Sequence, residues 1–198
     1  MSRLGIFGGS FDPVHTGHLI LAEACREALS LDEVWFVPAA RPPHKSGRPL
    51  ASMKDRLDLL TLATAGRGDF LVRDLESDRD GPSYTVDTLR LVRDERPDDD
   101  LVFLMGADSL ADLPGWRDPE GIAALATIAA ANRGFGEAAV PQSLPASVRD
   151  RVVVVAMPAC GISASDVRGR TAEGRSVRYL VPRAVEVAIA SRGLYRGP

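Results

Sequence analysis

Cysteine, lysine and long apolar runs are all scarce in this sequence of 198 residues. The two cysteines, Cys25 and Cys160, are too few for a disulfide framework, so a cytosolic, reducing location is expected. A run of about 18 apolar residues is missing, which argues against a membrane-spanning helix. Lysine occurs only twice beside 22 arginines. The formal net charge of −3 and the pI near 5.6 disfavour a broad nucleic-acid-binding surface but not a small anionic ligand.

The composition is that of a globular protein, with 45% hydrophobic and 26% charged residues. The length suits one domain that can bury a sizeable core, and no linker or internal repeat divides it. Residues 1–198 are therefore expected to form a single domain. The sequence leaves the oligomeric state open, and a homo-oligomer is compatible with it.

Short apolar runs alternate with helix-forming segments along the chain. The predicted strands cover residues 4–7, 33–37, 70–72, 101–105, 126–131 and 152–156, and the predicted helices cover about 16–29, 53–65, 85–96, a segment from about 163, and 182–191. This alternation predicts an α/β fold, with a mostly parallel sheet flanked by helices. Ligands bind beyond the carboxyl ends of such strands, so the loops after the first, second and fourth strands should face one crevice.

The first of these loops carries a glycine pair and two histidines. Gly8 and Gly9 are predicted to turn the chain so that backbone N–H groups approach a ligand closely. The helix that follows offers unpaired N–H groups and its positive dipole end to an anion. His15 and His18 are three residues apart and share a face at the start of that helix. The spacing matches neither the dinucleotide-binding glycine pattern nor the Walker loop.

Zinc is the alternative ligand for these histidines. His15, His18 and Cys25 lie roughly along one stripe of the predicted helix. Cys25, however, lies two turns deeper in an apolar helix, and no second cluster of cysteine and histidine supplies the remaining ligands. The sequence therefore favours an anion over a metal at this helix start.

Two further loops carry side chains suited to a nucleotide. After the second strand, prolines hold Arg41, His44 and Lys45 outward, a cationic set suited to phosphate, although a solvated basic loop would look the same. After the fourth strand, Asp108 can meet ribose hydroxyls. Trp116 can stack on an aromatic ring, or it can seal the edge of the core.

Two predicted helix starts carry hydroxyl side chains. Ser83 is expected to cap the helix that begins near residue 85. Ser163, with Asp166 three residues later, has the shape of a capping box. Ser163 and Ser165 also offer hydroxyls to a phosphate there, and Arg168 lies about one turn further on.

These segments together resemble a known family. Residues 8–18 (GGSFDPVHTGH) and 162–168 (ISASDVR) are similar to the HxGH and ISxxxxR motifs of the nucleotidylyltransferase superfamily. The pieces at 42–45, 83–89, 106–109, 113–116 and 177–195 resemble the bacterial nicotinate-nucleotide adenylyltransferases, so the resemblance covers essentially the whole chain. Two departures are Ala164-Ser165, where the family tends to have two hydroxyl residues, and Asn132-Arg133-Gly134, where it tends to have arginine, proline and glycine.

The resemblance implies a Rossmann-like fold and an enzyme that joins nicotinate mononucleotide to the α-phosphate of ATP, with release of pyrophosphate. It implies Mg²⁺ that arrives with ATP, no metal ligands of the chain's own, and no nucleic-acid or membrane partner. The implied catalytic residues are His15, His18 and Arg168. The implied ATP-binding residues are Gly8, Gly9, Ser10, Phe11, His15, His18, Gly106, Asp108, Ser163, Ser165 and Arg168. The implied mononucleotide-binding residues are His44, Lys45, Tyr84, Thr85, Asp108, Trp116 and Arg133.

Two other functions stay open from the sequence. A sister enzyme that adenylylates phosphopantetheine, or cytidylylates a small alcohol phosphate, would share the histidine motif but gives no reason for the segments around Tyr84 and Trp116. A nucleotide-binding regulator without catalysis would be favoured by loss of either histidine, yet His15 and His18 are both present.

Overall fold

Six parallel strands form the sheet of this protein in the computed structural model, which describes residues 2–43, 50–132 and 140–197. The strand order is β3-β2-β1-β4-β5-β6. The strands are β1 (Arg3–Gly9), β2 (Glu33–Pro38), β3 (Phe70–Val72), β4 (Asp100–Gly106), β5 (Thr127–Asn132) and β6 (Val152–Ala156). The prediction of an α/β fold with a parallel sheet is confirmed.

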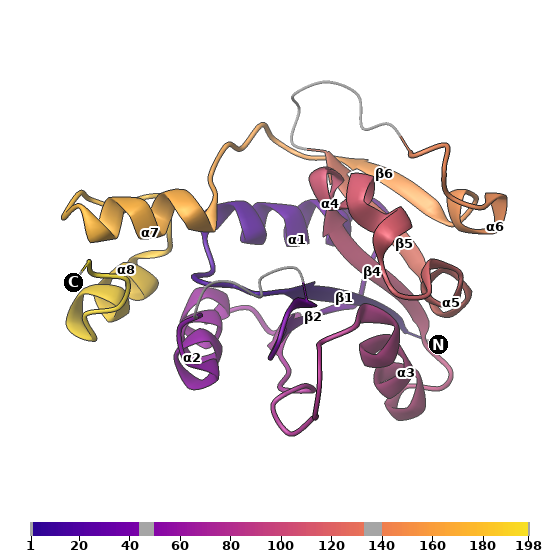
Figure 1. Ribbon diagram of the computed structural model, residues 1–198, viewed down its shortest axis with the longest axis horizontal. Coiled ribbons are helices and arrows are strands. Elements are labelled where there is room, and N and C mark those ends of the chain that lie inside the picture. Colours follow the sequence, from indigo (N-terminus) through magenta and orange to yellow (C-terminus); the bar gives the residue numbers. More distant parts are fainter. Residues whose placement is uncertain (1, 44–49, 133–139, 198) are drawn as a thin grey trace.

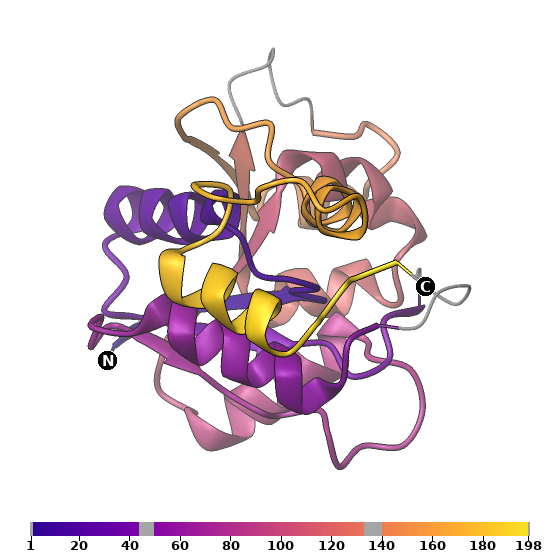
Figure 2. The same ribbon diagram turned by 90° about the vertical axis from the view of Figure 1, so that its left-hand side faces the viewer.

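Helices connect the strands and cover both faces of the sheet (Figure 1). They are α1 (Thr16–Leu29), α2 (Met53–Thr64), α3 (Thr85–Glu95), α4 (Ala107–Asp112), the 3₁₀ helix η2 (Leu113–Gly115), α5 (Pro119–Leu125), α6 (Ala146–Arg149), α7 (Ala164–Ala172) and α8 (Arg183–Ser191). Figure 2 shows α8 lying alongside α2 at one end of the molecule. Within the described ranges, none of these helices has the length and apolar character needed to cross a bilayer.

The two faces of the sheet bury two separate cores. Alternate residues of β1 point to opposite faces, so Leu4 and Ile6 pack with α3 and α5, whereas Phe7 packs with α1 and α2. Gly5 lies on the Phe7 face, where a Cβ atom would come within 2.8 Å of Leu31 and 2.9 Å of Leu104. A glycine at this position therefore allows helix α1 and its following turn to lie close against the central strand.

The sheet reverses its strand order beside β1, which pairs with β2 on one side and β4 on the other. Connections from β1 and β4 leave toward opposite faces at this point, so their carboxyl ends diverge and leave a crevice. The predicted convergence of the loops after β1, β2 and β4 depends on this topology.

Three local predictions are wrong in detail. Strand β1 extends through Gly8 and Gly9 instead of turning there, because both residues pair with β2. Ser83 does not cap α3: Tyr84 is the N-cap residue, and the Ser83 hydroxyl accepts a hydrogen bond from the Arg41 N–H at 2.9 Å. The short helices α4, α5 and α6 were not predicted, although Asp118 caps α5 in the manner expected before proline.

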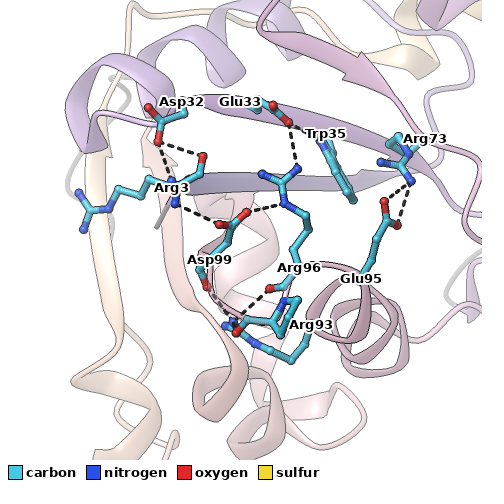
Figure 3. Close-up of polar contacts among 11 residues, drawn as sticks. Arg3, Asp32, Glu33, Trp35, Arg73, Arg93, Glu95, Arg96 and Asp99 are labelled. Carbon is cyan, nitrogen blue, oxygen red and sulfur yellow. Dashed lines mark hydrogen bonds and ion pairs between the residues drawn. The ribbon is translucent and has the colours of Figure 1, made fainter.

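Charged residues form hydrogen bonds and ion pairs with one another at the edge of the sheet where the strands begin (Figure 3). The Asp99 carboxylate accepts hydrogen bonds from the Ser2 N–H at 3.0 Å and from Arg96 Nε at 2.6 Å. Arg96 also lies 3.7 Å from Glu33, whose carboxylate accepts from Trp35 Nε1. These contacts tie the starts of β1 and β2 to the turn before β4.

The carboxylates of this edge predict how stability depends on pH. The backbone hydrogen bond from Ser2, together with Arg96, holds the pKa of Asp99 below its ordinary value, and the Arg3 N–H does the same for Asp32. A carboxylate with a lowered pKa stabilises the fold above its unfolded-state pKa, and this contribution is lost as the pH falls through its folded-state pKa. We therefore expect the thermal unfolding temperature to fall steeply below about pH 4.

The variant Asp99→Asn tests this contribution. It should unfold a few degrees earlier at neutral pH and show a shallower decline on acidification, because one of the titrating groups has been removed. Asp98→Asn, in the exposed neighbouring position, is the matched control and should follow the unaltered protein. Parallel pH curves for Asp99→Asn and the unaltered protein would contradict the assignment.

Candidate functional site

A cavity of about 730 Å³ lies at the carboxyl ends of the central strands. Nine of the predicted site residues line it: Gly8, Gly9, Ser10, His18, Tyr84, Thr85, Gly106, Asp108 and Trp116. They come from the end of β1, the starts of α1 and α3, and the segment after β4. The structure therefore brings Gly8, Gly9 and Ser10 together with Trp116, which lies more than 100 residues later in the sequence.

The two histidines lie against each other at the start of α1. Their rings are stacked with centroids 3.6 Å apart, and the His15 N–H donates to His18 Nδ1 at 3.1 Å. Because Nδ1 accepts this bond, a neutral His18 ring carries its proton on Nε2. His18 lines the cavity, so Nε2 is the ring donor for a ligand. His15 is only 3% exposed and is not among the lining residues, so its backbone and ring position His18.

The glycine between the histidines occupies a crowded position. A Cβ atom at Gly17 would lie 3.1 Å from both the Cys160 Sγ atom and the His15 Nδ1 atom. A side chain at this position would require the His15 ring and the Cys160 sulfur to shift by a few tenths of an ångström. Glycine therefore fits the close packing around the two histidines.

One expectation about the start of α1 requires correction. The first N–H groups of the helix were expected to be unpaired, but Thr16 N–H donates to the Leu180 carbonyl and His18 N–H donates to the His15 carbonyl. The segment before α8 covers this helix end, and the Thr16 hydroxyl also donates to the Tyr179 carbonyl. The positive end of the helix dipole remains near the cavity, although these two N–H groups are engaged.

The buried side chain of Phe11 packs against His18. Its side chain is 1% exposed and packs edge-on against Phe7 and His18, with ring centroids 5.2 Å and 5.0 Å away. Its φ angle of 43° turns the backbone out of the strand. Any contact of Phe11 with a nucleotide would therefore use its backbone.

Arg168, which belongs to the motif at residues 162–168, contacts the loop that follows β1. Arg168 on α7 donates to the Asp12 carbonyl at 2.6 Å and to the Ser165 hydroxyl at 3.0 Å. Ser163 caps α7, as predicted, by accepting from the Asp166 N–H. Arg168 thus contacts the loop after β1, and Ser163, Ser165 and Arg168 are not among the residues that line the cavity.

Part of the cavity lining is aromatic. Trp116 is half-buried and packs edge-on against Phe103 with centroids 6.1 Å apart, so it both borders the cavity and closes the core. Tyr84 and Thr85 lie at the start of α3 and are half-buried. Asp108, on α4, is exposed at the rim. The two interpretations of Trp116, as stacking residue and as core residue, are thus compatible.

Some predicted residues are not placed by this structure. His44, Lys45 and Arg133 lie outside the described residues. Cys25, the third residue of the zinc alternative, is fully buried in the core, and burial raises the pKa of its thiol to about 12. A thiol with this pKa stays protonated at neutral pH, whereas zinc binds the thiolate. In the described ranges, no three His, Cys, Asp or Glu side chains are grouped to hold a metal ion.

The chain matches the cytidylyltransferase-like family model over residues 6–170. A relative from Thermomicrobium roseum, named "Probable nicotinate-nucleotide adenylyltransferase", is 52% identical over 99% of this chain and 92% of its own length. A relative of the same name from Thermus thermophilus is 49% identical over 98% of this chain and its full length. A solved structure of the Plasmodium falciparum nicotinic acid mononucleotide adenylyltransferase complexed with NaAD superposes with a TM-score of 0.79 at 18% identity, covering 98% of each chain.

The chain belongs to the nicotinate-nucleotide adenylyltransferase family. It is therefore a nucleotidyltransferase, and the resemblance seen in the sequence is confirmed. Membership of this family sets aside the two alternatives, a sister enzyme for phosphopantetheine or an alcohol phosphate and a regulator without catalysis. The distant solved structure supports the fold alone.

Arg56 is a residue of the site that the sequence did not reveal. It lies on α2, is 2% exposed, and donates to the carbonyls of Ser10 at 2.9 Å, Ala39 at 2.8 Å and Ala51 at 3.2 Å. Burial lowers the pKa of its guanidinium, and the nearby Asp12 carboxylate opposes this effect. The side chain thus joins the loop after β1 to the loop after β2. In the sequence, one arginine among 22 gives no signal of this role.

We expect Arg56→Met to loosen both loops at once. Three carbonyls would lose a charged donor, and the free energy of unfolding should fall by about 2–4 kcal/mol. Hydrogen–deuterium exchange should rise over residues 8–14 and 38–43. Arg56→Lys should recover only part of this, since one ammonium cannot bridge three carbonyls in the geometry of a guanidinium.

The control for this change is Arg192→Met. Arg192 on α8 pairs with Asp55 and Asp58 on the same helix α2, but its side chain is 37% exposed. Its loss should lower the free energy of unfolding much less than the loss of Arg56 and leave exchange in both loops unchanged. Equal effects of the two substitutions would show that Arg56 is not the link between the loops.

Proposed function

We propose that this protein joins nicotinate mononucleotide to the α-phosphate of ATP, giving nicotinate adenine dinucleotide and pyrophosphate, a step of NAD biosynthesis. The observation that carries the proposal is that one cavity is lined both by Gly8, Gly9, Ser10 and His18 and by the aromatic residues Tyr84 and Trp116. A triphosphate suits the first group of residues and a pyridine ring the second. The names of the relatives support the same pair of substrates.

The reaction needs no general base. The attacking group is the phosphate of the mononucleotide, whose second pKa of about 6 leaves it ionised at neutral pH. One of its oxygens bonds to the α-phosphorus while the bond to the bridging oxygen breaks, and that oxygen leaves with pyrophosphate. The protein must hold the two phosphates in line and stabilise the charge that builds up on the α-phosphate and the leaving group. Magnesium enters with the triphosphate as part of the substrate.

His18 is the proposed donor to the α-phosphate. Its Nδ1 is occupied by the His15 N–H, so Nε2 keeps a proton that it can donate to a phosphate oxygen. Phe7 and Phe11 surround the ring and limit its rotation. The donor is thus oriented before the substrate arrives, as transition-state stabilisation requires.

The remaining roles follow the arrangement of the loops. Backbone groups of Gly8, Gly9 and Ser10 would lie against the α- and β-phosphates. Arg168 and the hydroxyls of α7 would hold the departing phosphates, and Asp108 would meet ribose. His44 and Lys45 would take the mononucleotide phosphate, with Arg133 assisting. A cytosolic location, inferred from the two cysteines, is part of the same proposal.

Pyrophosphate release with matched substrates tests the function. With MgATP, the protein should release pyrophosphate rapidly with nicotinate mononucleotide, more slowly with nicotinamide mononucleotide, and not with phosphopantetheine or glycerol phosphate. The dinucleotide product should appear in equal amounts. Release with phosphopantetheine instead, or ATP binding without release on any of these substrates, would overturn the proposal.

His18→Ala should lower turnover by at least ~10²-fold, because it removes a donor to the transition state. The substitution also removes the acceptor for the His15 N–H, so His18→Asn is the second variant. An asparagine oxygen can accept that N–H and keep the helix start intact. His18→Asn should unfold close to the temperature of the unaltered protein, and both variants should turn over slowly. Turnover within about threefold of the unaltered protein would exclude the donor role.

A further inference from the structure

One cation lies beside the aromatic residues that line the cavity. Arg117 directly follows Trp116, the C-cap residue of η2, and its guanidinium lies over the Tyr84 ring with Cζ 4.6 Å from the ring centroid. The side chain is 57% exposed. The stacking on Tyr84 keeps it at the mouth of the part of the cavity where the pyridine ring is proposed to lie.

The other charges of the lining oppose an anionic ligand. Among the described lining residues, Glu76, Asp108 and Asp112 are acidic, and Arg117 is the one residue with a permanent positive charge. Glu76 is 6% exposed and is held by the Ala40 N–H and the Thr88 hydroxyl. A ligand carboxylate would therefore enter a cavity whose described lining carries three carboxylates, and a nearby guanidinium would offset their repulsion.

Arg117 is only loosely engaged with the protein. Its ion pair with Asp87 is 3.9 Å long, whereas Arg90 and Arg79 approach the same carboxylate to 2.9 Å and 3.5 Å. Asp87 is thus already paired by arginines that do not line the cavity. The guanidinium of Arg117 can turn toward a ligand without leaving Asp87 unpaired.

We propose that Arg117 is a specificity-determining residue that favours the acid form of the mononucleotide over the amide. The inference rests on the proposed function and deepens it. Backbone N–H groups at the start of α3 can donate to an amide oxygen as well as to a carboxylate oxygen, so they discriminate weakly. A guanidinium attracts the charged carboxylate and gains little from a neutral amide. The discrimination therefore depends on the side chain at position 117.

The test compares kcat/KM for nicotinate mononucleotide with kcat/KM for nicotinamide mononucleotide. Arg117→Met keeps an apolar chain over Tyr84 and removes the charge. The ratio of the two constants should fall about tenfold, through a higher KM for the acid, while the KM for MgATP stays unchanged. Arg117→Lys should keep most of the ratio. Arg90→Met is the matched control, since Arg90 also pairs with Asp87 but does not line the cavity, and its ratio should match that of the unaltered protein.

Ionic strength gives a second readout that a purely structural role would not move. Because the guanidinium is more than half exposed, salt should screen its attraction, and the ratio of the unaltered protein should decline as salt rises from about 0.05 to 0.5 M. The ratio of Arg117→Met should stay nearly flat over the same range. Thermal unfolding of each variant checks that the fold is kept.

Several outcomes would overturn the inference. A ratio for Arg117→Met within twofold of the unaltered protein would do so, and equal losses with both mononucleotides would place Arg117 at their shared phosphate instead. These results need an active unaltered protein, so they leave the proposed function standing. If the unaltered protein releases no pyrophosphate with nicotinate mononucleotide, the proposed function fails and the role of Arg117 fails with it.

Discussion

The site depends on a buried guanidinium that joins the loops after two neighbouring strands. Arg56 donates to the carbonyls of Ser10 and Ala39, which follow β1 and β2. A buried charge is costly unless its hydrogen bonds are made, and a buried carbonyl is costly unless it has a donor. The two requirements meet in one side chain. Arg56 therefore fixes the Ser10 and Ala39 carbonyls relative to each other in the structure without a ligand.

The second support of the glycine loop comes from the far end of the chain. Arg168 binds the Asp12 carbonyl, and the Leu180 carbonyl receives the Thr16 N–H. Burial, with the charge of Asp12 adding to it, raises the pKa of the Tyr195 hydroxyl, which therefore stays protonated beside that carboxylate. Residues between 165 and 195 thus contact Asp12 and Thr16, which belong to the motif at residues 8–18. This explains why similarity to the family extends to the tail: without the tail, the start of α1 and the Asp12 carbonyl would lose their partners.

Much of this arrangement could be predicted from the sequence because it depends on local patterns. The apolar runs and the helix signals determine the strands and most helices, and right-handed crossovers then bring the loops after β1, β2 and β4 together. The contacts between distant residues could not be predicted. Ser83 looks like a helix cap, but its hydroxyl is bound to the Arg41 N–H 42 residues earlier. Arg56 looks like any exposed arginine, because no local pattern shows that its helix packs over two strand ends.

The distribution of arginine follows from the difference between the two edges of the sheet. At the amino edge, Arg96 and Asp99 form an ion pair (Figure 3). Arg3 pairs with Asp100 at the same edge. At the carboxyl edge, Arg56 and Arg168 are turned inward onto carbonyl oxygens of the loops. Arg117 differs from both groups, since its main neighbour is an aromatic ring and its ion pair is long. Arg56, which donates to three carbonyls, supports the loops, whereas Arg117, held mainly by stacking, can bind a ligand. The surroundings of each arginine, and not the number of arginines, therefore decide which of them can bind the ligand.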